Sequence, residues 1–142
     1  MTPTQGHYYE DIHAGQKAVR STLVTEHMLV AFAEVSGDKN PVHLDADYAA
    51  GTMFKERIAH GMLSAGFISA VVGMDLPGPG AIYIQQTLNF KAPVKIGDTV
   101  ITTVQVVELM PKRRVRFTTV CTVNGKSVVE GEAIMMAPAK PA

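Results

Sequence analysis

The sequence is poor in cysteine, has no tryptophan and carries no excess charge of either sign. Its 142 residues include one cysteine, Cys121. A single cysteine cannot form an intramolecular disulfide, which argues against a secreted, disulfide-stabilised scaffold. Thirteen basic residues balance thirteen acidic ones, whereas a general nucleic-acid binder is expected to carry a basic excess for its phosphate contacts. We therefore expect no nucleic-acid partner.

Long hydrophobic runs are also missing. The N-terminus does not join a basic start to an apolar stretch, so it lacks the pattern of a secretory signal. The most apolar segment, residues 58–74, is interrupted by polar side chains and falls short of the about 20 apolar residues that cross a membrane. These observations predict a cytoplasmic protein with no membrane partner. The length fits a single domain over residues 1–142, with residues 1–10 and 137–142 expected to be flexible.

The first half of the chain predicts mainly helices. Residues 17–24 indicate a strand, and Thr25 can cap a helix that continues to about residue 35. Residues 37–41 are expected to form a loop, because Pro41 disfavours a helical conformation at the residue before it. A short helical turn follows at residues 45–50, and a longer helix at about 59–74 is apolar on nearly every side, so other structure should surround it. The first helix is expected to bury one apolar stripe at helical spacing: Met28, Leu29, Phe32, Ala33 and Val35.

The second half of the chain predicts four strands, at residues 81–90, 99–109, 113–123 and 126–136. Alternating apolar and polar residues and many β-branched ones favour this assignment. Asn124-Gly125 is a strong hairpin signal between the last two strands. The element order predicts an α+β protein in which a curved antiparallel sheet wraps around a long central helix, which is the layout of the hot-dog fold.

The segment before the short helical turn carries the most suggestive chemistry. Because Pro41 prevents a continuous helix, a bent loop can turn Asp38 and His43 toward one point. There, Asp38 could take a proton from water while His43 orients that water or supplies a proton. Asn40, between them, can hold the loop or a substrate group through its amide. Ordinary turn chemistry needs the same residues, and on these residues alone the turn is the more frequent outcome.

A second candidate lies where the long helix begins. The first N–H groups of a helix have no partner within it and lie at its positive end, so the Gly61 N–H could donate to a substrate carbonyl that gains negative charge. Alternatively, Gly61 only allows close packing at the helix start. We expect His60 to be a capping or packing residue.

The run Ser36-Gly37-Asp38-Lys39-Asn40-Pro41-Val42-His43, with Ala49 six residues later, resembles the signature of the (R)-specific enoyl-CoA hydratases, also called hydratase 2 or MaoC-like dehydratases. One departure is Phe32, which stands where the family pattern usually has tyrosine. Residues 60–63, 77–80 and 90–98 also resemble family features, so the likeness spans roughly residues 17–136.

This resemblance implies a homodimeric hot-dog protein that hydrates trans-2-enoyl-CoA to (R)-3-hydroxyacyl-CoA. The implied reaction needs no cofactor, since coenzyme A is part of the substrate. Asp38 and His43 match the catalytic pair of the family, and Gly61 matches its oxyanion donor. Four further positions match residues that support or line the substrate site: Asn40, Ser69, Val72 and Met135.

Other interpretations stay open. A hot-dog thioesterase would share the fold, the acyl-CoA ligand and the oxyanion donor, and a non-catalytic acyl-thioester module would use the same loop as structure. His43, Asp45 and Asp47 with His60 could be imagined as a metal site, but acidic residues are also favoured at a helix start, and we predict no metal. A basic cluster at residues 112–116 could meet coenzyme A phosphates or be a solvated hairpin end.

Overall fold

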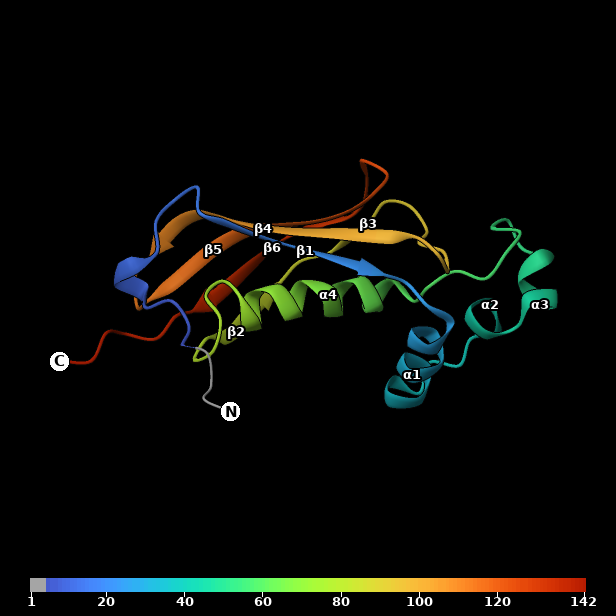
Figure 1. Cartoon of the computed structure of the whole chain (residues 1–142), viewed down its shortest axis with the longest axis horizontal. Coiled ribbons are helices and arrows are strands. Elements are labelled where there is room, and N and C mark those ends of the chain that lie inside the picture. Colours follow the sequence, from blue (N-terminus) through green and yellow to red (C-terminus); the bar gives the residue numbers. More distant parts are fainter. Residues whose placement is uncertain (1–4) are drawn as a thin grey trace.

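The structure is a computed structural model that describes residues 5–142. Its sheet lies over a long central helix, α4, and helices α1, α2 and α3 gather at one end of the molecule (Figure 1). The elements are η1 (Tyr9–Asp11), β1 (Lys17–Leu23), α1 (Glu26–Ser36), α2 (Pro41–Leu44), α3 (Ala46–Ala50), α4 (Gly61–Met74), β2 (Ile82–Gln86), β3 (Asn89–Phe90), β4 (Thr99–Met110), β5 (Arg114–Val123) and β6 (Lys126–Met136).

The sheet is antiparallel throughout, with strand order β1-β4-β5-β6-β2 and with β3 paired to β6. The predicted α+β hot-dog fold is confirmed. The single strand expected over residues 81–90 is wrong, because the segment is interrupted at residues 87–88 and divides into β2 and β3, which pair separately with β6. At the break, the Thr87 carbonyl passes so close to Gly131 that a side chain there would collide with it.

Alternate residues of the long strands face α4 and form the core. Four residues of α4 are buried against them: Ser64, Ile68, Val71 and Val72. The strand residues are buried at every second position, as expected for a sheet with one covered face: Val100, Thr102, Val104 and Val106 on β4, and Val115, Phe117, Thr119 and Cys121 on β5. Burial raises the pKa of the Cys121 thiol, so this cysteine is an inert core residue.

The start and end of α1 follow the sequence prediction. The Thr25 hydroxyl accepts a hydrogen bond from the Met28 N–H (3.3 Å), and Gly37 ends the helix in the left-handed conformation at φ 81°. The predicted apolar stripe is wrong at Val35, which is 84% exposed. At 100° per residue, Val35 points about 200° away from the buried Ala33, so it faces solvent.

Two further expectations are corrected. Pro41 is not in the loop but is the first residue of α2, a position where proline is tolerated because its missing N–H would be unpaired anyway. The long helix is not surrounded on all sides, since Met62 and Met74 are 53% and 54% exposed. Within residues 5–142, no helix is long and apolar enough to cross a membrane.

The two ends of the described chain contact each other. The Tyr9 N–H donates to the Pro138 carbonyl (2.8 Å), and Lys140 pairs with Asp11 (2.9 Å). Residues 1–4 of the segment expected to be flexible lie outside the described residues, and the flexibility of both ends stays a prediction.

Candidate active site

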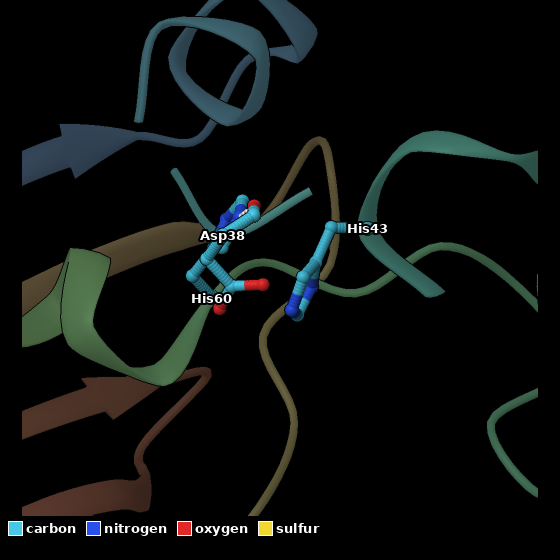
Figure 2. Close-up of side chains that lie close together, drawn as sticks. All are labelled: Asp38, His43 and His60. Carbon is cyan, nitrogen blue, oxygen red and sulfur yellow. Dashed lines mark hydrogen bonds between the residues drawn. The ribbon is translucent and has the colours of Figure 1, made fainter. Parts of the chain in front are cut away.

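Three side chains from different elements converge at the end of the molecule that carries the short helices. Asp38 lies in the loop before α2, His43 lies on α2, and His60 directly precedes α4. One ligand-type atom from each lies within 4.8 Å of the other two. Figure 2 shows the Asp38 carboxylate and the His43 ring directed toward each other. The loop thus brings together the two residues that the sequence paired.

The loop between α1 and α2 is shaped by local hydrogen bonds. The Asp38 carboxylate accepts from the Asn40 N–H (3.2 Å), and the Asn40 side-chain oxygen accepts from the Val42 N–H (3.2 Å), which caps α2. These are the turn bonds expected of Asp and Asn before a proline. Asp38 nevertheless remains exposed, so the turn interpretation and the chemical interpretation of this loop are compatible.

The hydrogen bonds of His43 define which of its nitrogens faces the site. His43 is 8% exposed, and its Nδ1 lies 2.8 Å from the Ile58 carbonyl. A carbonyl can only accept, so Nδ1 carries the hydrogen, and in the neutral ring Nε2 is an acceptor. Arg57 holds the same turn from behind, because it donates to the His43 carbonyl (2.8 Å) and pairs with Glu26 (2.8 Å).

His60 contacts both Asp38 and His43, which the sequence did not predict. It occupies the N-cap position of α4 but makes no side-chain capping bond. Instead, it is 2% exposed, its Nε2 donates to the Asp38 carbonyl (2.9 Å), and its ring stacks on that of His43 with centroids 3.8 Å apart. Phe32 packs against His60 at a centroid distance of 4.8 Å, so the phenylalanine that departs from the family pattern is a packing residue here.

Gly61 lies at the wall of a mainly apolar pocket of about 620 Å³ beside these residues. Within residues 5–142, no acceptor is paired with the Gly61 N–H, as expected at a helix start. A Cβ at this position would lie 2.8 Å from Cε1 of Phe90. The pocket also contacts Asp38, His60 and apolar side chains from several elements: Met53, Phe54, Ile58, Met62, Phe90, Pro93, Val94 and Val129.

The other predicted substrate residues lie elsewhere. Asn40 caps α2, Ser69 is exposed on α4, and Val72 and Met135 are buried in the core. None of these four is among the described residues that line the pocket, and their substrate roles stay predictions. Sequence reasoning missed Met53, Met62 and Phe90 as lining residues. Met62 and Phe90 were within segments that resemble the family, at residues 60–63 and 90–98, but no signal marked Met53.

The basic cluster lies around the β4–β5 hairpin, at the opposite end of the sheet from α1, α2 and α3 (Figure 1). Lys112 and Arg113 form its tip with positive φ. Arg116 pairs with Glu108 (3.1 Å) and Glu132 (2.7 Å), so part of the positive charge is neutralised within the sheet.

The geometry of Asp38, His43 and His60 is unfavourable for a metal ion. The rings of His43 and His60 are stacked at an interplanar angle of 25°. Lone pairs of ring nitrogens lie in the ring planes, so those of nearly parallel rings point side by side instead of converging on one ion. In addition, His43 Nδ1 and His60 Nε2 already donate to carbonyls. Asp45, considered earlier with these histidines, caps α3 by accepting from the Tyr48 N–H (3.1 Å).

Comparisons with known proteins agree on one family. A sequence profile of the MaoC like domain matches residues 10–131. The chain is 58% identical to an (R)-specific enoyl-CoA hydratase of Rhodospirillum rubrum, with 94% of each chain covered. It is 49% identical to a 3-hydroxybutyryl-CoA dehydratase of Methylorubrum extorquens, over 94% of this chain and 85% of that one. The structure is similar to the R-hydratase PhaJ1 of Pseudomonas aeruginosa, with a TM-score of 0.92, 53% identity and coverage of 95% and 88%. The resemblance carried by residues 36–43 is confirmed, and the chain belongs to the MaoC-like domain family.

Proposed function

We propose that the protein catalyses the reversible hydration of trans-2-enoyl-CoA to (R)-3-hydroxyacyl-CoA. The observation that carries this proposal is the convergence of the Asp38 carboxylate and the His43 ring beside a pocket that reaches the start of α4. The relatives named as an (R)-specific enoyl-CoA hydratase and a 3-hydroxybutyryl-CoA dehydratase support this reaction class.

In the proposed mechanism, one water lies between Asp38 and His43. Nε2 of neutral His43 accepts one hydrogen bond from this water and orients it, while the Asp38 carboxylate accepts its other proton. The hydroxyl adds to C3 of the enoyl group, and the electron pair of the double bond moves toward the thioester oxygen. The Gly61 N–H stabilises the charge on that oxygen. Asp38 then gives its proton to C2, so that the elements of one water are added to the same face.

An assay with crotonyl-CoA separates this proposal from its two competitors. The absorbance of the conjugated enoyl group and the release of free thiol are followed together. Loss of absorbance without thiol supports hydration. A thioesterase would release thiol, because it attacks the carbonyl, and a non-catalytic acyl-thioester module would change neither signal.

We also propose that the reaction needs no metal or other cofactor and takes place in the cytoplasm. The near-parallel rings of His43 and His60 support the first statement. We expect hydration by the purified protein to be unchanged after treatment with a chelator and dialysis into metal-free buffer. Loss of activity that Zn²⁺ or Mg²⁺ restores would contradict this expectation.

We further propose that the protein is a homodimer. Strand β2 lies at one edge of the sheet, and apolar side chains along β2 and β3 are exposed: Ile82 by 54%, Ile84 by 39% and Phe90 by 55%. Proteins cover or pair such edges because unpaired strand groups invite association. A second copy that pairs its own β2 with this edge would cover both the edge and the neighbouring apolar residues.

Analytical ultracentrifugation tests the dimer. We expect a dimer at micromolar concentration, and we expect Ile84→Arg to shift it toward monomer because the charge would be buried in the interface. Val19→Arg is the matched control, since Val19 is exposed (53%) on β1 at the opposite edge. A folded monomer of the wild-type protein, or dissociation by Val19→Arg alone, would show that the β2 edge is not the interface.

A further inference from the structure

We propose that His60 is a positioning residue that fixes the positions of Asp38 and His43 relative to each other. The inference rests on the proposed function, because it assigns His60 a role through the two residues that handle the water. The capping role expected for His60 is wrong, because its side chain makes no capping bond, while the expected packing role is confirmed by its contacts with Phe32 and His43. His60 itself does not need to exchange a proton with the substrate.

The first contact fixes the backbone of Asp38. His60 Nε2 donates to the Asp38 carbonyl across 22 positions of sequence (2.9 Å). Other hydrogen bonds of this loop are local: the Asp38 N–H donates to Ser36, and the Asn40 N–H donates to Asp38. Within residues 5–142, the bond from His60 is thus the hydrogen bond that ties Asp38 to a distant part of the chain. It links the backbone of Asp38 to the N-terminus of α4, where Gly61 lies.

The second contact fixes the plane of the His43 ring. The two imidazoles are stacked, with centroids 3.8 Å apart, and the Phe32 ring also packs against His60. In the described part of the chain, the hydrogen bond of the His43 ring is the one from Nδ1 to the Ile58 carbonyl (2.8 Å). The ring could still tilt around this single bond. One buried ring therefore sets both the position of Asp38 and the direction of His43 Nε2.

The free nitrogen of His60 shows that packing alone does not explain a histidine at this position. Its Nδ1 is buried and has no hydrogen-bond partner in the described part of the chain, and an unpaired buried polar atom is destabilising. If the ring only filled space between His43 and Phe32, phenylalanine would fill it without that penalty. The observed histidine is explained by the one thing phenylalanine lacks, the N–H that reaches Asp38.

We predict that stability and turnover respond differently to His60→Phe. We expect the melting temperature to stay equal or rise, while kcat for crotonyl-CoA falls by about 10–100-fold, since small misplacement of catalytic groups is costly. KM should change by less than about threefold, because the loss falls on the transition state and not on ground-state binding. His60→Gln keeps an N–H donor of similar reach and should retain more kcat than His60→Phe.

Val115→Ala serves as the control for destabilisation alone. Val115 is fully buried on β5, outside the pocket, so this variant should lower the melting temperature and keep the wild-type kcat. Wild-type kcat in folded His60→Phe would overturn the proposal. So would a loss confined to KM in that variant.

A spectroscopic test on the wild-type protein does not depend on activity or on the folding of a variant. Long-range ¹H–¹⁵N correlation spectra report which imidazole nitrogen carries hydrogen, and His60→Gln assigns the signals of His60 among the five histidines. We expect the Nε2–H tautomer for His60. The Nδ1–H tautomer at neutral pH would overturn the proposal. If the spectra agree but the wild-type protein does not hydrate crotonyl-CoA, the proposed function fails while the geometry of His60 stands.

Discussion

Asp38→Asn is expected to lower the rate of enoyl-CoA hydration by about 10²–10⁴, the usual contribution of a positioned acid or base. Asparagine keeps the side-chain oxygen that accepts from the Asn40 N–H, so the turn should persist while the proton acceptor is lost. The measurement is kcat with crotonyl-CoA, with the melting temperature beside it. Lys39→Ala is the matched control in the same loop, because Lys39 is exposed and pairs with Glu34 on the surface (3.5 Å).

His43→Asn is expected to cause a loss of similar size. Its amide nitrogen can keep the bond to the Ile58 carbonyl while Nε2 is removed. If both residues handle the same water, the double variant should be little worse than the poorer single variant, since residues that act as a unit are strongly non-additive. Losses that multiply would show that Asp38 and His43 act independently and would refute the shared water.

Gly61→Ala is expected to lower kcat by about 10²–10³, the usual cost of losing one oxyanion donor. The new methyl group would lie 2.8 Å from the Phe90 ring and at the wall of the pocket, where the thioester must approach the helix start. Phe90 is 55% exposed, so its ring has room to move. The fold should therefore survive, and the melting temperature checks this.

The same substitution made in a Phe90→Ala protein separates two explanations for the loss in Gly61→Ala. One is that the N–H donor is blocked, and the other is that the new methyl group collides with the Phe90 ring. In Phe90→Ala, the neighbour that would collide with a side chain at Gly61 is gone. The proposal predicts that Gly61→Ala still lowers kcat by about 10²–10³ relative to Phe90→Ala alone. Recovery of the Phe90→Ala rate in the double variant would mean that Gly61 serves packing and does not donate to the substrate.

The pairing of Asp38 with His43 was predictable because it depends on local rules. Gly37 ends α1 in a left-handed conformation, Asn40 and Pro41 bend the chain, and the two side chains are separated only by this turn. The hairpin at Asn124-Gly125 was predictable for the same reason, since two adjacent residues determine the conformation of its turn.

The role of His60 and the shape of the pocket were not predictable from local sequence. His60 meets Asp38 and Phe32 only after α4 docks on the sheet, and no periodicity encodes that contact. The exposure of Met62 was missed because an apolar helix looks the same whether it is covered by its own chain or by another. The exposure of Val35 was missed because its position in the sequence is close to the helical spacing of the apolar stripe. Its direction on the helix, measured from Ala33, nevertheless points it to solvent.

The central claim is best tested by the product that the wild-type protein makes from crotonyl-CoA in deuterium oxide. We expect (R)-3-hydroxybutyryl-CoA with deuterium at C2 on the face that receives the hydroxyl, and formation of this product about 10²–10⁴-fold more slowly by Asp38→Asn in parallel. The (S) product, addition to opposite faces, release of free thiol, or equal rates for the two proteins would contradict it.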